Sequence, residues 1–330
     1  MAANAPLHLC ATNGFAHGFR QVHSSHIDPS FYAFGISRSL EAYISNDAAH
    51  FALLGTFLLQ HALNSSDVVL DVGGNHGFYS MFAARLGFHV DYFEPQPALR
   101  ERACIAAAYN NISLSMYSAG VGRQRGSHAI VGREGLAHAG GACRDGDPTS
   151  RCMQVFTLDA LYIAATDVSA PPIALIKIDN EGWEIGVLEG ARELLRQKAS
   201  TTGHSRVGSL FIEVAPKRWA PRAQISVTEG AAELTRVARL GYSTTLVTKS
   251  DRHCPHELAR NLSAASVPAI CLGRPCPGAA RFTDVRAGEL TALMERMVEL
   301  EEMRRVETSC NIWMVHASWT GGKRLRATNV

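Results

Sequence analysis

The chain has 330 residues, which fits one large domain or two small ones. Hydrophobic residues make up 46% of it, enough for a sizeable core, so wholesale disorder is excluded. The 32 basic and 30 acidic residues leave a net charge of +2. A balance so close to neutral argues against a protein that coats nucleic acid or binds membranes through a polybasic surface.

Local sequence disfavours membrane insertion and a signal peptide. The uncharged stretch from residue 48 to residue 66 is broken by polar residues such as His50, Gln60 and His61. A membrane span needs about 20 mostly apolar residues, so we expect a buried helix there and no stable membrane span. The first residues lack a basic start followed by a long apolar run, so the sequence does not predict a signal peptide there.

The eight cysteines leave the cellular compartment open. None forms a Cys-x-x-Cys pair, so a zinc knuckle is not expected. Cys143 and Cys152 form one cluster, and Cys254, Cys271 and Cys276 form another. Both clusters lie in Gly- and Pro-rich sequence of the kind in which secreted proteins place disulfides. Reduced cysteines in a cytosolic enzyme fit equally well, so cytoplasmic and secretory-lumenal locations are both retained.

Helices and strands alternate through the first two thirds of the chain. Apolar residues at helical spacing predict a helix over 47–63. Strands are predicted at 68–72, 89–94, 112–117, 173–179 and 209–214, with helices up to residue 85, over 97–109 and over 183–198. This alternation favours a parallel sheet with right-handed crossovers. The fourth strand is almost wholly apolar, as a strand buried on both faces requires.

The remaining segments complete or decorate this sheet. Helices are predicted over 227–240 and 286–305, and strands over 242–247 and 311–316. The Gly-rich stretch 120–150 is interpreted as a loop or short hairpin. We predict one domain over 46–330, preceded by an N-terminal extension over 1–45. A Cys-, Pro- and Gly-rich insertion at about 250–284 has the length typical of lids and binding loops.

A glycine-rich turn follows the first strand of the alternation, at residues 71–77. Open parallel sheets bind ligands at the carboxyl ends of their strands, and two classes of cofactor use such a turn. Dinucleotides favour the pattern G-x-G-x-x-G. Read from Gly73 that pattern meets Asn75, and read from Gly74 it meets His76, so it fails in both registers.

S-adenosylmethionine (SAM) fits this turn better. Its methionine end carries an ammonium, a sulfonium and a carboxylate. Asp71 suits the cationic groups, and the amides around Gly73, Asn75 and Gly77 suit the carboxylate. Glu94 ends the second strand, where a carboxylate can accept hydrogen bonds from both ribose hydroxyls. We therefore predict that these five residues bind SAM.

Three segments resemble the signatures of one protein family. Residues 70–77, Leu-Asp-Val-Gly-Gly-Asn-His-Gly, resemble D-x-G-A-N-x-G. Residues 93–97, Phe-Glu-Pro-Gln-Pro, resemble F-E-P-x-P, and residues 176–184, Ile-Lys-Ile-Asp-Asn-Glu-Gly-Trp-Glu, resemble I-K-I-D-V-E-G-x-E. Over about residues 50–215 the chain thus resembles the FkbM-type SAM-dependent methyltransferases.

The resemblance implies an α/β fold of the class I methyltransferase (Rossmann-like) type, with a mostly parallel seven-stranded sheet and helices on both faces. It also implies SAM as methyl donor, and usually O-methylation of sugars or natural products. The chain departs from the family pattern at Gly74, where alanine is usual, and at Asn180, where valine is usual. The first change adds only backbone freedom, and the second places an amide beside Asp179.

The acidic residues after the fourth and fifth strands are the candidate catalytic groups. Methyl transfer needs the acceptor atom aligned with the sulfonium, and a base when the acceptor is a hydroxyl. Asp179 and Glu181 are placed to hold the SAM ammonium or to act as that base, and Glu213 to face the acceptor. Lys177 is expected to form an ion pair at the edge of the core, and Glu184 to be structural.

Alternatives remain at this site. Asp179, Asn180 and Glu213 offer oxygen ligands that suit Mg²⁺, although the preferred interpretation has no metal. The preferred function is SAM-dependent O-methylation of a hydroxyl on a sugar or small metabolite. A catalytically degenerate domain that binds SAM or a partner is the alternative, and an NAD-type oxidoreductase is disfavoured by the failed glycine pattern. The acceptor is expected to be a small molecule or glycan rather than nucleic acid, and the oligomeric state is left open.

Overall fold

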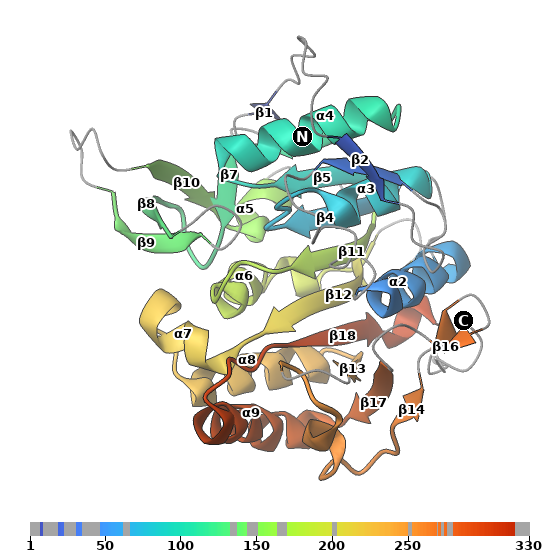
Figure 1. Ribbon diagram of the computed structural model, residues 1–330, viewed down its shortest axis with the longest axis vertical. Helices are drawn as coiled ribbons and strands as arrows, with labels where there is room; N and C mark the ends of the chain where they lie inside the picture. Colours follow the sequence, from blue (N-terminus) through green and yellow to red (C-terminus); the bar gives the residue numbers. More distant parts are fainter. Residues whose placement is uncertain are drawn as a thin grey trace.

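The computed structural model describes most of the chain, and its elements are arranged as drawn in Figure 1. The described residues are 7–8, 19–22, 31–34, 47–61, 67–132, 137–143, 151–163, 170–199, 203–249, 253–268, 270–271, 274–275 and 280–320. Most of the predicted N-terminal extension and part of the predicted insertion lie outside these residues. The proposed division into an extension and one domain therefore stays a prediction.

A ten-stranded sheet occupies the centre of the molecule (Figure 1), in the order β1-β6-β5-β4-β11-β12-β18-β13-β17-β14. Its strands are β1 (Leu7–His8), β4 (Val68–Val72), β5 (His89–Phe93), β6 (Ser115–Tyr117), β11 (Ile173–Ile178), β12 (Val207–Val214), β13 (Tyr242–Thr248), β14 (Val267–Pro268), β17 (Arg281–Val285) and β18 (Cys310–His316).

Seven of these strands form the sheet that the sequence predicts. Strands β6, β5, β4, β11 and β12 pair in parallel with their neighbours, and β18 runs antiparallel to both β12 and β13. Six of the seven strands therefore share one direction, which confirms the mostly parallel arrangement. Strands β1, β14 and β17 extend the sheet with antiparallel pairs, so the complete sheet is mixed.

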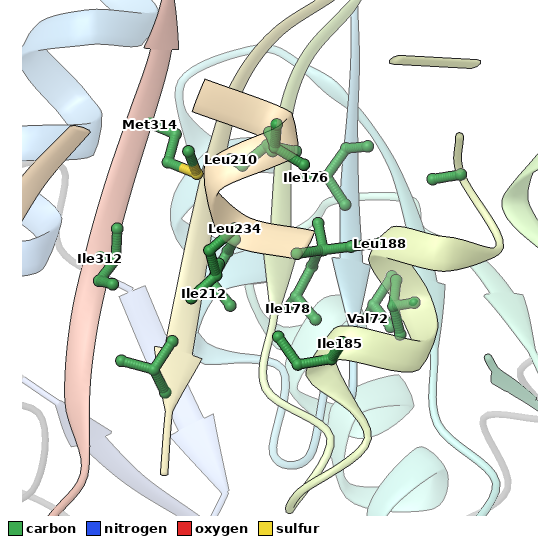
Figure 2. Close-up of a cluster of buried hydrophobic side chains, with 14 of the residues drawn as sticks. Val72, Ile176, Ile178, Ile185, Leu188, Leu210, Ile212, Leu234, Ile312 and Met314 are labelled. Atoms are coloured by element: carbon green, nitrogen blue, oxygen red, sulfur yellow. The ribbon is translucent and has the colours of Figure 1, made fainter. Parts of the chain in front are cut away.

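Helices cover both faces of the sheet. One face packs against α2 (Ala48–His61), α3 (Phe78–Arg85) and α4 (Pro97–Tyr109), and the other against α5 (Leu158–Tyr162), α6 (Glu184–Glu189), α8 (Val227–Arg239) and α9 (Leu290–Arg304). Figure 2 shows the second layer, where Ile185 and Leu188 of α6 and Leu234 of α8 lie over branched side chains of the strands. All six residues of β11 are buried, as its apolar sequence predicts.

A second, four-stranded sheet stands where we expected a loop or short hairpin. Its order is β7-β10-β8-β9, built from β7 (Ala119–Val121), β8 (Gly126–Val131), β9 (His138–Ala142) and β10 (Cys152–Phe156). It projects from one side of the molecule in Figure 1. The short-hairpin alternative is confirmed for β8 and β9, which pair antiparallel within this stretch. The flanking strands β7 and β10 were not expected, because they pair with each other across more than 30 residues of sequence.

Other boundaries differ from the prediction in smaller ways. The helix expected over 183–198 ends at Glu189 and is followed by a short 3₁₀ turn at Leu194–Arg196. Helix α7 (Pro216–Ala223) was not predicted, and strand β17 lies partly in the expected insertion. In the described part of the chain no helix is both long and apolar enough to cross a membrane.

The described cysteines form disulfides. Cys143 pairs with Cys152, as their cluster suggests. Cys254 pairs with Cys310 in β18, 56 residues away, and not within its own sequence cluster. This long-range pair is set by the sheet, which places the start of β18 beside the end of β13, the strand that Cys254 follows. Disulfides are what the secretory-lumenal alternative predicts.

Candidate functional site

A cavity of about 640 Å³, counted with its open mouth, lies at the carboxyl ends of β4, β5 and β11. Parallel strands bring these ends to one edge of the sheet, which is where open α/β sheets bind ligands. The predicted residues Gly73, Asn75, Glu94, Asp179 and Glu181 all line it. The small sheet supplies the opposite wall through residues of β7, β8, β9 and β10.

The glycine turn after β4 is held by its backbone. Gly73 and Gly74 donate their N–H groups to the Phe93 carbonyl, each at 3.0 Å. Gly73 has φ 73°, and a Cβ there would collide with the carbonyl oxygen of Asp179. Asn75 also has a positive φ, 50°, and its carbonyl accepts a hydrogen bond from the Tyr92 hydroxyl at 2.5 Å. The turn therefore needs glycine at Gly73 for both conformation and space.

Glu94 is fixed by two backbone donors. The Asn75 N–H donates to Oε2 at 3.0 Å and the Gln96 N–H to Oε1 at 2.8 Å. Burial raises the pKa of Glu94, while these two N–H donors act in the opposite direction. The side chain of Arg100 donates to the Glu94 carbonyl at 2.9 Å. A carboxylate is thus held at the rim of the cavity, where the sequence predicts a ribose ligand.

Asp71 and Gly77 do not line the cavity. Asp71 is fully buried, accepts a hydrogen bond from the Ser80 hydroxyl at 2.6 Å and lies 3.3 Å from Lys177 Nζ. Gly77 precedes α3 with φ 78° and packs against Ala103 of α4. Both residues therefore support the turn from beneath, and their predicted contact with the cofactor is not what their positions favour.

Lys177 connects the glycine turn with the end of β11. Its Nζ donates to the Gly73 carbonyl at 2.7 Å and lies 3.6 Å from Asp179 Oδ2, in addition to its pair with Asp71. Burial disfavours the ammonium, but Asp71 and Asp179 outweigh it and raise the pKa of Lys177. The predicted ion pair at the core edge is confirmed. The cation is buried, with 4% of its side chain exposed.

Three carboxylates meet at the ends of β11 and β12. Oxygen atoms of Asp179, Glu181 and Glu213 lie within 4.8 Å of one another, and we call these three residues the acidic cluster. Arg218 Nη1 donates to Glu181 at 2.9 Å and to Glu213 at 3.2 Å. Arg222 Nη1 donates to Glu181 at 3.1 Å. The two arginines compensate much of the negative charge of the cluster within the chain itself.

The protonation of this region is set by burial. Burial raises the pKa of Glu213 well above its usual value, the charge of Asp179 adds to this, and Arg218 opposes it. Burial also raises the pKa of Glu181, against Arg218. Three carboxylate oxygens within 4.8 Å can share a cation. Glu181 is the third carboxylate of this group, and the side-chain Nδ2 of the expected ligand Asn180 donates to the Val121 carbonyl at 3.0 Å.

Glu184 is structural, as expected. It is 1% exposed and accepts hydrogen bonds from the backbone N–H groups of Asn180 and Gly182 and from the indole of Trp219. Burial raises its pKa to about 7 despite these donors. Its bonds hold the turn in which Glu181 has φ 56° and Gly182 has φ 98°. The direction of the Glu181 side chain depends on this turn.

The comparison with protein families bears on the cofactor and the kind of enzyme. Residues 71–229 match the family model described as the Methyltransferase FkbM domain. Residues 71–229 form an FkbM methyltransferase domain. SAM is its cofactor, and its fold is that of the class I methyltransferases, a largely parallel sheet with helices on both faces. All the predicted site residues, and the whole small sheet, lie inside this FkbM domain.

Solved structures similar to the chain are methyltransferases at low sequence identity. One is a precorrin-6y C5,15-methyltransferase from Geobacter metallireducens GS-15, with 8% identity, 80% of this chain and 87% of that chain covered, and a TM-score of 0.34. The plantazolicin methyltransferase BpumL in complex with SAH has 9% identity, 84% and 85% coverage and a TM-score of 0.35. An rRNA methylase from Streptococcus thermophilus has 15% identity, 71% and 95% coverage and a TM-score of 0.33. No curated protein matches the chain.

Sequence reasoning missed two residues of the FkbM domain that touch the acidic cluster, Arg218 and Arg222. Both lie on α7, which follows β12 directly. Pro216 at the start of that helix and two arginines four residues apart are a recognisable signal. Pro221 inside the helix obscured it, because proline is disfavoured in helix interiors.

Proposed function

We propose that this methyltransferase transfers the methyl group of SAM to a hydroxyl oxygen of a sugar or small metabolite. The observation that carries the proposal is the acidic cluster beside the cofactor cavity, with Glu213 half-buried next to Asp179. A carboxylate whose pKa is raised by burial is a stronger base than a solvated one. It can take the proton from an acceptor hydroxyl as the new O–C bond forms.

Different residues of the cavity would bind SAM and activate the acceptor. Glu94 would hold the ribose hydroxyls, and the backbone amides of the glycine turn would hold the carboxylate of the methionine end. Asp179, which lines the cavity, would face the ammonium. SAM supplies the methyl group from its sulfonium. Glu213 would orient and deprotonate the hydroxyl, while Arg218 keeps the neighbouring carboxylates apart in fixed positions.

Cofactor binding is tested by titration calorimetry with SAM and with NAD on the full chain. We expect SAM to bind and NAD not to. Glu94→Gln replaces one acceptor oxygen by an NH₂ group that cannot accept a hydrogen bond from a ribose hydroxyl, and loss of that bond costs about 1–3 kcal/mol of binding free energy. SAM affinity should therefore fall by about 5- to 150-fold. Glu193→Gln, at an exposed ion pair with Arg196, is the matched control and should bind as the wild type does.

The acceptor class is tested by methyl transfer to a panel. The panel should contain glycans, phenols and aliphatic hydroxy compounds, with amines and RNA oligonucleotides as separate arms, and products should be located by mass spectrometry. We expect O-methyl products, and their loss in Glu213→Gln with SAM affinity retained. N-methyl products, or transfer to RNA alone, would replace the proposed acceptor. SAM binding without transfer to any arm would favour the binding-domain alternative.

A further inference from the structure

The wall of the cavity opposite the main sheet is the small sheet β7-β10-β8-β9. Ile130 of β8, His138 and Ala139 of β9, and Met153 and Val155 of β10 line the cavity from this side. A ligand bound at the strand ends therefore lies between the main sheet and the small sheet. Its affinity depends on how firmly the small sheet is held in place.

The small sheet has little core of its own. Its buried hydrophobic cluster consists of Ala139, Met153 and Val155, with Ile130 and Trp183 packed against them. Among the described residues, strand β9 is at the edge of this sheet and pairs with β8. A segment with few buried apolar contacts has low local stability. The β8–β9 hairpin, defined here by residues 126–132 and 137–143, is thus the weakly supported part of the cavity wall.

Trp183 joins this hairpin to the main sheet. It lies in the turn after β11, two residues beyond Glu181, and lines the cavity itself. Its indole Nε1 donates to the Ala139 carbonyl at 3.2 Å. The His128 ring meets the indole edge-on, with the ring centres 5.2 Å apart. One side chain from the catalytic edge therefore contacts both strands of the hairpin.

We propose that Trp183 is a positioning residue that holds the β8–β9 hairpin against the bound cofactor. The inference rests on SAM binding in this cavity. Apparent affinity equals intrinsic affinity multiplied by the fraction of molecules whose wall is in place. Loss of the Trp183 hydrogen bond lowers that fraction, so it weakens SAM binding without removing any group that the mechanism above assigns to SAM.

The Cys143–Cys152 disulfide is a second restraint on the same wall. It joins the residue after β9 to the first residue of β10, and both strands line the cavity. Because the two restraints act on one element, their removal should not be independent. With the disulfide absent, the hairpin depends more on Trp183, and the effect of changing Trp183 on SAM affinity becomes larger.

The test uses the full chain and two matched substitutions. Trp183→Phe keeps an aromatic ring and removes the N–H donor. Trp319→Phe removes an equivalent indole bond, to the Ser205 carbonyl at 2.7 Å, far from the cavity lining. We expect SAM affinity by calorimetry to fall about three- to tenfold in Trp183→Phe. It should stay within about twofold of wild type in Trp319→Phe, even where thermal unfolding shows a similar loss of stability.

Two further measurements separate positioning from general damage. SAM should change tryptophan emission in the wild type and in Trp319→Phe but not in Trp183→Phe, because Trp183 is the tryptophan, of the four in the sequence, that lines the cavity. Hydrogen exchange of the free protein should accelerate in Trp183→Phe within 126–132 and 137–143 and not elsewhere. If Trp183→Phe unfolds on thermal analysis, Trp183→Tyr is measured in its place.

The outcomes are distinguishable. If the wild type binds SAM and Trp183→Phe binds it equally well, or if hairpin exchange is unchanged, the positioning role is wrong and the cofactor site stands. If the wild type does not bind SAM, the cofactor site itself is wrong. The triple variant Trp183→Phe, Cys143→Ser, Cys152→Ser should raise the Kd for SAM by more than the product of two factors, that of Trp183→Phe alone and that of the two cysteine substitutions together. If the two factors only multiply, the restraints act independently and the proposal that they hold one wall is contradicted.

Discussion

The glycine turn and the acidic cluster lie at the same edge of the sheet but are held by different forces. The turn residues Gly73 and Asn75 and the neighbouring Glu94 are fixed by backbone N–H and carbonyl groups at 2.8–3.0 Å. In the acidic cluster, Glu181 and Glu213 are fixed by Arg218 at 2.9 and 3.2 Å. Backbone bonds persist through changes of pH and salt, whereas ion pairs respond to both. The backbone of the turn should therefore be less sensitive to pH and salt than the acidic cluster.

Lys177 offers the largest expected effect, because it bridges the two regions. Lys177→Met would leave the buried Asp71 without its cation, and uncompensated buried charges cost about 3–5 kcal/mol of unfolding free energy. Urea denaturation measures this. The double variant Lys177→Met with Asp71→Asn should recover part of the loss.

The control for Lys177 is Lys217→Met, which breaks an ion pair with Glu302 on the surface. Exposed pairs contribute about 0–1 kcal/mol, so its stability should stay close to that of the wild type. Equal losses of unfolding free energy in Lys177→Met and Lys217→Met would show that the buried contacts of Lys177 stabilise the fold no more than a surface ion pair does.

The second effect concerns the pH dependence of stability, through Glu184 beneath the acidic cluster. Its pKa is raised from 4.5 to about 7 in the folded protein, so its contribution is full below pH 4.5 and is lost as the pH rises to about 7. The change amounts to about 3 kcal/mol. The difference in unfolding free energy between wild type and Glu184→Gln should fall by that amount across this window, because the amide does not titrate. A difference that stays constant with pH would contradict the assignment.

The smallest expected effect concerns Arg218, and it tests whether SAM binding depends on the acidic cluster. Arg218→Met removes the donor shared by Glu181 and Glu213 and should cost about 2 kcal/mol of unfolding free energy. SAM affinity should change by less than about threefold, since the turn and Glu94 are untouched. Calorimetry and urea denaturation measure the two quantities.

Arg192→Met is the matched control for Arg218. Arg192 is 45% exposed, and its partner Glu233 keeps a second bond, from Arg236. We expect a loss below about 1 kcal/mol. A large fall of SAM affinity in Arg218→Met would contradict this comparison. It would show that SAM binding depends on the ion pairs of the acidic cluster as well as on the glycine turn and Glu94.

Much of the cofactor side could be predicted because its signals are local. The turn at 71–77 and the strand end at Glu94 belong to one strand–helix–strand unit, and the two backbone bonds to Glu94 follow from that geometry. The apolar run of β11 predicted a strand buried on both faces, and all of its residues are buried. Lys177 could be assigned to an ion pair because a lysine inside such a strand needs a buried partner.

The sequence by itself determined the alternation of strands and helices, the cofactor class and the residues of the turn, since these depend on periodicity and on neighbours in the chain. Only the tertiary structure decided that Asp71 supports the turn from beneath, that Arg218 and Arg222 reach the acidic cluster, and that a glycine-rich strand forms the far wall of the cavity. It also decided the partner of Cys254. Each of these depends on contacts between segments distant in sequence, and no local pattern records which distant segments the sheet will place side by side.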